Sequence, residues 1–188
     1  MIRLGSNSPT RALILKNFGI DFIQNGGVFD EDSITTTNPK AFCYEATKGK
    51  FNELYKKYGI EDIPLLVADS VVTCEGKLLR KAKDLNDAIA MLELQSGNKT
   101  SVITCMIYKS KEKELIDISI TTYEFEKFDE THIQEYLDSG LCFGKAGAIM
   151  VEGFCKPYIK NVIGYESCAM GLCIEKLIPF LNNKYSFY

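Results

Sequence analysis

Histidine and paired cysteines are scarce in this sequence. His132 is the single histidine among 188 residues, so a Ser-His or Cys-His nucleophilic arrangement would have to use it. It falls in the first turn of an expected amphipathic helix, which is typical of a surface or boundary residue. The seven cysteines include no Cys-x-x-Cys pair. We therefore expect no structural zinc site and interpret the cysteines as reduced, small core residues.

Long hydrophobic runs and a strong charge of one sign are also missing. No apolar run approaches the roughly 18 residues needed to span a bilayer, and the first residues lack the basic-then-apolar pattern of a signal peptide. The net charge of −3 gives no general attraction to nucleic acid. We expect a cytoplasmic protein that binds neither a membrane nor a nucleic acid polymer. Because no repeat or linker interrupts the chain, residues 1–188 are expected to form one domain.

Strand and helix patterns alternate along the chain, which predicts an α/β protein with a mixed sheet. The expected strands are residues 2–4, 21–23, 64–72, 77–79, 100–108 and 115–125. The expected helices, with their capping residues, are 9–18, 39–58, 84–96, 129–139 and 167–181.

Hydrophobic spacing also predicts which faces are buried. The expected inward stripe of helix 39–58 consists of Tyr44, Lys48, Phe51, Tyr55 and Tyr58. Helix 9–18 is expected to turn Leu13, Ile14 and Phe18 inward. In strand 115–125 the isoleucines at 116, 118 and 120 alternate with polar residues, so one face of this strand is expected to be buried and the other wet.

A carboxylate stands in the middle of the apolar run 64–72. Asp69 is not a helix N-cap, because two valines follow closely and no helical pattern starts there. An unpaired buried charge is costly, so this carboxylate must have a partner. Two interpretations remain: Asp69 accepts hydrogen bonds at a strand bulge, or it works at a functional site. We favour the functional site.

The turn at residues 6–11 joins a strand to a helix, with Ser8 as the expected N-cap and Pro9 as the first helical residue. Backbone N–H groups and the helix dipole would converge there, which makes the turn a candidate phosphate cradle. It lacks the full P-loop pattern. The alternative is an ordinary capped helix with Arg11 in solvent.

Three further charged segments could serve the same cleft. The acidic loop 30–32 contains Glu31 and is either solvated or a Mg²⁺ ligand, since hard cations prefer carboxylates, phosphate oxygens and water. Lys48, in its apolar stripe, either points into a cleft or extends its amine to water. The basic turn 80–83 could bring Lys81 back beside Asp69, where it would meet phosphate charge.

An ordered series of motifs resembles the Maf family. Residues 4–11 resemble its Leu-Ala-Ser-x-Ser-Pro-Arg-Arg opening, and residues 68–72 resemble its Ala-Asp-Thr-Val-Val. The other matches are Asp30-Glu31 with its acidic pair, Lys48-Gly49 with its Lys-Ala, residues 80–84 with its Gly-Lys-Pro-x-Asp, Ser96-Gly97 and Thr104 with its Leu-Ser-Gly and Thr block, and residues 145–153 with its Lys-Ala-Gly-Ala-Tyr-x-Ile-Gln-Gly. The matches run in order across almost the whole chain, which makes the set specific.

The resemblance implies a nucleoside triphosphate pyrophosphatase that cuts NTPs or dNTPs between the α- and β-phosphates with a divalent cation, Mg²⁺ or Mn²⁺. It implies a mixed, twisted sheet flanked by helices, in two lobes with a central cleft, similar to inosine triphosphate pyrophosphatases. Asp69 would accept the proton of the attacking water, Glu31 would assist, both would hold the metal, and Lys81 would also act in catalysis. The implied substrate-binding residues are Ser6, Ser8, Arg11, Lys48, Lys81 and Glu152.

The sequence departs from the family motifs at Thr10 for arginine, Ala82 for proline, Thr100 for histidine and Glu152 for glutamine. These departures leave the preferred base open between dTTP or UTP and 7-methyl-GTP. They also leave two alternative functions open. One is a nucleotide-binding regulator of cell division and septum formation with little turnover, and the other is an enzyme specific for deaminated purines such as ITP. A homodimer is left open as well.

Overall fold

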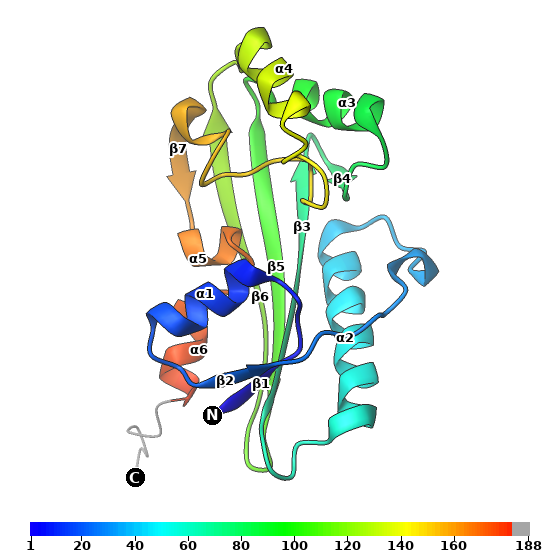
Figure 1. Ribbon diagram of the computed structural model, residues 1–188, viewed down its shortest axis with the longest axis vertical. Helices are drawn as coiled ribbons and strands as arrows, with labels where there is room; N and C mark the ends of the chain where they lie inside the picture. Colours follow the sequence, from blue (N-terminus) through cyan, green and yellow to red (C-terminus); the bar gives the residue numbers. More distant parts are fainter. Residues whose placement is uncertain (182–188) are drawn as a thin grey trace.

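The computed structural model describes residues 1–181, in which one seven-stranded sheet runs through the molecule (Figure 1). Six strands follow the order β2-β1-β3-β5-β6-β7, and β4 pairs with β3. The strands are β1 (Ile2–Leu4), β2 (Phe22–Gln24), β3 (Leu65–Cys74), β4 (Lys77–Leu79), β5 (Lys99–Lys109), β6 (Glu114–Phe125) and β7 (Ile159–Ile163). Strand β1 pairs in parallel with β2 and β3, and the other pairs are antiparallel. The predicted mixed α/β fold is confirmed.

The first four helices begin at the predicted positions. The single helix expected over residues 167–181 is wrong, because residues 170–173 divide it into two helices and Gly171 there adopts a φ of +103°. The helices are α1 (Pro9–Asn17), α2 (Pro39–Tyr58), α3 (Leu85–Gln95), α4 (Glu130–Asp138), α5 (Glu166–Ala169) and α6 (Ile174–Leu181), with 3-10 helices at Glu31–Ser33 and Lys156–Tyr158. The side chains of Ser8, Asn38, Asp84 and Asp129 each accept a hydrogen bond from a backbone N–H in the first turn. These side chains satisfy donors that have no partner inside the helix.

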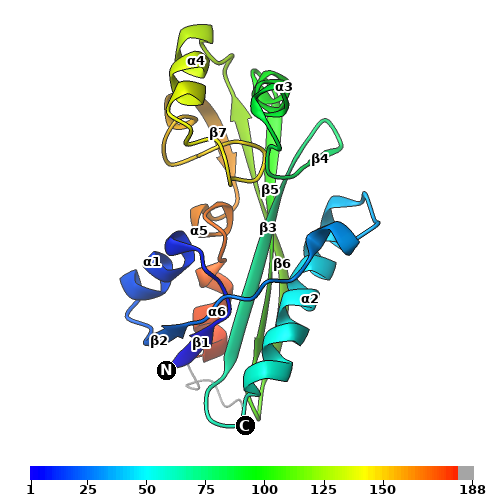
Figure 2. The same cartoon turned by 45° about the vertical axis from the view of Figure 1, so that its right-hand side comes forward.

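Helices divide the molecule into two lobes along the three long strands β3, β5 and β6 (Figures 1 and 2). In the lower lobe, α2 covers one face of the sheet, and α1 and α6 cover the other. In the upper lobe, α3 and α4 pack over a core that includes Leu92, Val102 and Phe125. A separate core around Leu4, Leu15 and Leu177 fills the lower lobe. No helix within residues 1–181 is long and apolar enough to cross a membrane.

The apolar face of β6 is not buried as its alternation predicts. Ile116, Ile118 and Ile120 are 48%, 40% and 37% exposed. They lie on the α2 side of the sheet, but α2 packs on β3 and β5 and does not extend over β6. The opposite face of β6 carries Asp117 and Ser119. It is half-buried on the side of the sheet where α5 and α6 pack. Alternation identified the two faces correctly but not which face a helix covers.

The expected inward faces of α1 and α2 are also partly wrong. Leu13 in α1 and Phe18 just after it are exposed, whereas Ile14 and Leu15 are buried. In α2 the buried side chains are Phe42, Cys43, Ala46, Thr47, Phe51 and Leu54. Tyr55 and Lys48 are exposed. Small residues let α2 approach the sheet closely, so the helix buries this face rather than its tyrosine stripe.

Candidate active site

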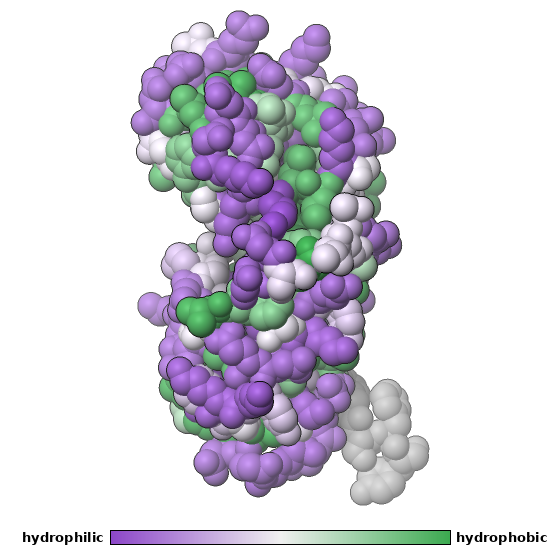
Figure 3. Space-filling model, turned by 90° about the vertical axis from the view of Figure 1, so that its right-hand side faces the viewer, coloured by the Kyte–Doolittle hydropathy of each residue, from purple (hydrophilic) through white to green (hydrophobic). Residues whose placement is uncertain are grey.

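A cavity of about 580 Å³ lies between the two lobes. The outline of the molecule narrows between them in the space-filling view (Figure 3). The predicted site residues that line the cavity are Ser6, Ser8, Arg11, Glu31, Asp69, Lys81 and Glu152. Lys50, Ser70 and Lys145, which were not chosen from the sequence, line it as well.

The cavity forms where one edge of β3 is left open. Among the described residues, β1 pairs with β3 only through Leu65 and Leu66, and β4 joins from Val72 onward. The stretch between them therefore has no paired strand on that side. Because side chains alternate along a strand, Asp69 points toward the α2 face and Ser70 toward the α1 face. The open edge lets both side chains reach one cavity.

Asp69 is 92% buried in an unbroken ladder. It lies opposite Cys105 on β5, and its neighbours keep the same antiparallel register, so the alternative of a strand bulge is wrong. The whole residue is 8% exposed and its side chain is 11% exposed. One carboxylate oxygen, Oδ1, accepts a hydrogen bond from the Lys50 ammonium at 2.7 Å. Asp69 thus has the charged partner that a buried carboxylate requires.

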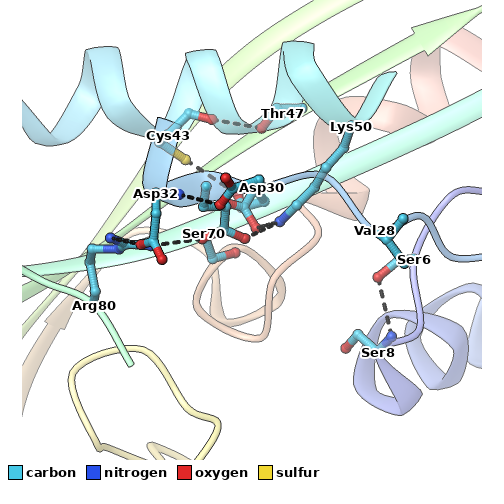
Figure 4. Close-up of polar contacts among 12 residues, drawn as sticks. Ser6, Ser8, Val28, Asp30, Asp32, Cys43, Thr47, Lys50, Ser70 and Arg80 are labelled. Carbon is cyan, nitrogen blue, oxygen red and sulfur yellow. Dashed lines mark hydrogen bonds and ion pairs between the residues drawn. The ribbon is translucent and has the colours of Figure 1, made fainter. Parts of the chain in front are cut away.

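Lys50 joins Asp69 to Glu31. Its Nζ is 2.6 Å from Oε1 of Glu31 and 2.7 Å from Oδ1 of Asp69. Figure 4 shows the Lys50 side chain reaching from α2 toward these oxygens. Burial alone would raise the pKa of Glu31, but Lys50, Lys81 and Arg80 outweigh it and lower that pKa. Burial would lower the pKa of Lys50, but Asp69 and Glu31 raise it. Glu31 and Lys50 therefore stay charged near neutral pH.

Lys48 is not part of this cluster. It is exposed on α2, with its Nζ 5.6 Å from the centre of the Tyr44 ring. Lys50 stands two residues later, about 200° around the helix. It occupies the position in the cavity that was expected for Lys48. A sequence signal for Lys50 exists, because it follows Ala46 by four residues and Thr47 by three, and both are fully buried. The predicted aromatic stripe favoured a different face of α2, and it therefore indicated Lys48 instead of Lys50.

Arg11 is held in the cavity by neutral oxygens. Its Nε donates to the Gly171 carbonyl at 2.7 Å, Nη1 to Ser6 Oγ at 3.0 Å and Nη2 to Ser70 Oγ at 3.2 Å. No carboxylate within residues 1–181 forms an ion pair with it. Burial lowers the pKa of Arg11 from its ordinary value, and the charges of Asp69 and Glu31 only partly offset this. A fixed, unpaired guanidinium is suited to bind an anion.

The turn around Arg11 presents further donors. Ser8 caps α1 by accepting from the Arg11 N–H at 3.3 Å, and its own N–H donates to Ser6 Oγ at 3.2 Å (Figure 4). The helix N-terminus opens on the same cavity. These contacts fit the predicted phosphate cradle as well as the ordinary helix cap of the alternative interpretation, so the cradle stays a prediction.

The acidic loop and the basic turn meet across the cavity rim. Arg80 forms an ion pair with Asp32 at 2.8 Å and lies 3.9 Å from Glu31 (Figure 4). Lys81, the next residue, forms an isolated bridge with Ala146, and its side chain is exposed at the cavity. Glu152 lines the upper-lobe wall and is exposed. The hairpin thus brings Lys81 to the cavity that contains Asp69.

Comparison with known proteins identifies the family. The family described as Maf-like protein matches residues 1–184. The chain belongs to the Maf family. The resemblance of its motifs to the Maf family is therefore confirmed.

Similar proteins from several bacteria carry the name nucleoside triphosphate pyrophosphatase. A protein from Nitratiruptor sp. is 52% identical over 179 residues, which covers 94% of this chain and 96% of that protein. One from Helicobacter pylori strain J99 is 41% identical and covers 95% and 94%. One from Campylobacter jejuni is 36% identical over 183 residues and covers 96% and 100%.

A structural neighbour is more distant. The structure of the Staphylococcus aureus Ham1 protein has a TM-score of 0.46 and 14% sequence identity, and the match covers 66% of this chain and 71% of that chain. These values are too low to establish a shared fold. The expected similarity to inosine triphosphate pyrophosphatases therefore stays a prediction.

Proposed function

We propose that this Maf protein is a hydrolase that cuts nucleoside triphosphates to the monophosphate and pyrophosphate. The observation that carries the proposal is one cavity in which the Asp69–Lys50–Glu31 cluster faces the unpaired Arg11 guanidinium. The cavity has the size expected for a small-molecule ligand. The names of the relatives support the same reaction.

The cationic groups have the places that a triphosphate needs. Arg11, Ser6, Ser8 and the N-terminus of α1 would bind one part of the phosphate chain, and Lys81 would neutralise charge from the opposite wall. Phosphoryl transfer is catalysed mainly by positioning and by electrostatic stabilisation of the leaving oxygens. Glu152 would contact substrate from the upper lobe.

A divalent metal fits this site in part. Within residues 1–181 there is no group of three or more His, Cys, Asp or Glu side chains that could hold a metal ion. However, Mg²⁺ commonly takes only one or two protein carboxylates, with water and substrate phosphates as the other ligands. Glu31 and Asp69 would be those two, because one oxygen of each already points toward the same cation, the Lys50 ammonium. The metal would supply charge neutralisation at the phosphates.

Asp69 would act as the proton acceptor. Its second carboxylate oxygen accepts no hydrogen bond from a residue between 1 and 181, so it is available to a water molecule that attacks the α-phosphorus. Lys50 would keep Glu31 ionised and would orient both carboxylates.

Pyrophosphate release from a nucleotide panel tests this proposal. The panel contains the standard NTPs and dNTPs, ITP and 7-methyl-GTP, each with Mg²⁺ or Mn²⁺. Asp69→Asn should lower kcat by at least about 10²-fold, because the base and a metal charge are lost while the shape is kept. The matched control is Asp62→Asn, an exposed aspartate outside the cavity, which should keep the parent rate.

Two results would overturn the proposal. Asp69→Asn could release pyrophosphate at the parent rate, or the parent protein could bind nucleotides without turnover. The second result would favour a nucleotide-binding regulator. The same panel identifies the preferred base and metal.

A further inference from the structure

Gln95 has a buried amide whose role lies outside its own helix. It stands at the end of α3, and its side chain is fully buried. Its Nε2 donates at 2.8 Å to the Met91 carbonyl and at 2.8 Å to the Gly147 carbonyl. Its Oε1 is buried and has no hydrogen-bond partner in the described part of the chain. A fully buried glutamine with an unsatisfied acceptor lowers the stability of the fold. The hydrogen bond to Gly147 is therefore expected to serve a role that offsets this loss.

Gly147 lies at the joint between two segments of the cavity rim, the turn at residues 80–81 and the segment at residues 145–146. Its N–H donates to the Arg80 carbonyl at 2.9 Å, and its neighbour Ala146 bridges Lys81. Its φ is +65°, a conformation that favours glycine. A Cβ at this position would lie 2.8 Å from Val72 Cγ1. The backbone therefore fits tightly against β3 and is fixed from the other side by Gln95.

Two cavity lysines depend on this joint. Lys81 adjoins Arg80 and pairs with Ala146, and Lys145 precedes Ala146. Both lysines line the cavity opposite the Arg11 cradle, whereas Gln95 and Gly147 do not line it. The amide of Gln95 is thus linked to each lysine through two intervening residues, Gly147 with Arg80 for Lys81 and Gly147 with Ala146 for Lys145.

We infer that Gln95 is a positioning residue of this active site, which acts through Gly147 to hold Lys81 and Lys145 against the anionic part of the substrate. The inference rests on the proposed function. An apolar residue would avoid the unsatisfied Oε1, but it would leave the buried Gly147 carbonyl without this donor and the joint free to move. A displacement of about 1 Å can cost about 10²-fold in activity.

The test compares Gln95→Met, which keeps length and removes the donor, with Asn98→Leu. Asn98 is the matched control, because its Nδ2 donates at 2.8 Å to the Leu94 carbonyl of the same helix and does not bond the rim. Gln95→Met should raise KM about tenfold and change kcat by less than about threefold. Hydrogen exchange at residues 144–150 should become faster in the absence of nucleotide. Asn98→Leu should change neither KM nor that exchange.

A second variant protects the test against a folding failure. Gly147→Ala disturbs the same joint from the β3 side, where the added Cβ would press on Val72, and it should raise KM in the same way. Unchanged exchange at residues 144–150 in Gln95→Met would overturn the inference, as would equal changes in Asn98→Leu. If the parent protein hydrolyses no nucleotide, the proposed function fails. The exchange experiment, together with calorimetric binding of inorganic pyrophosphate to the parent and Gln95→Met, then decides the positioning role separately.

Discussion

At the scale of single residues, the site depends on the balance of one ammonium against two carboxylates. Lys50 lies within hydrogen-bonding distance of Glu31 and Asp69, and its side chain is 21% exposed. Removal of one partner from such a partly buried cluster leaves charge without compensation. Without Lys50, the two carboxylates would repel each other, and the pKa of Glu31 would rise.

Substitution of the two lysines on α2 separates the site residue from its neighbour. Lys50→Met should lower kcat/KM for pyrophosphate release at least about 10²-fold, because the charge that orients both carboxylates is lost. Lys48→Met removes an exposed lysine of the same helix and should change kcat/KM by less than about twofold. Equal losses in both variants would contradict the assignment of Lys50.

At the scale of elements, α2 positions the loop that carries Glu31. The Phe29 ring lies against Gly49, where a Cβ would come within 2.2 Å of a ring atom. The Val28 N–H donates to Glu53 Oε1 at 3.1 Å on the next turn of α2. Glycine in a helix interior is unfavourable by about 1 kcal/mol relative to alanine. Its presence here is explained by the space that Phe29 requires.

Gly49→Ala should therefore separate helix stability from activity. Alanine favours the helix, but its Cβ would push Phe29 outward and move the loop that holds Glu31. We expect pyrophosphate release to fall about tenfold, with α2 intact by circular dichroism. Phe29→Leu in the Gly49→Ala background should recover part of the activity, because leucine needs less space. A double variant no more active than Gly49→Ala would argue against this contact.

At the scale of the whole molecule, the long strands connect the two lobes. Strands β3, β5 and β6 are paired along their length and contribute to both the upper and the lower core. Shared strands should make the lobes unfold together, as one domain. Residues 182–188 of the expected domain lie outside the described residues.

Cavity-forming substitutions test this cooperativity. Leu92 belongs to the upper core and Leu177 to the lower core, and both are fully buried. Leu92→Ala and Leu177→Ala should each destabilise the protein by about 2–5 kcal/mol. Denaturation followed by both tyrosine fluorescence and circular dichroism should show a single transition in each variant. A variant in which only part of the signal shifts would mean that the lobes unfold independently.

The sequence by itself determined the features that depend on neighbours along the chain. Capping side chains such as Ser8 and Asp84, the glycine after α2 and the alternation in β3 specify where elements begin and end, because these signals act within a few residues. They also identified Asp69, Glu31 and Arg11 as candidates, since an aspartate in an apolar strand and a cation at a helix start are locally unfavourable.

Only the tertiary structure decided which face of each element is buried and which lysine reaches the site. The isoleucines of β6 are exposed because α2 extends over β3 and β5 alone. Lys50 rather than Lys48 meets Asp69 because the small residues of α2 set its rotation on the sheet. The contact of Gln95 with Gly147 joins residues 52 positions apart. Such long-range packing has no signal in the local pattern, so it emerges only when the elements assemble.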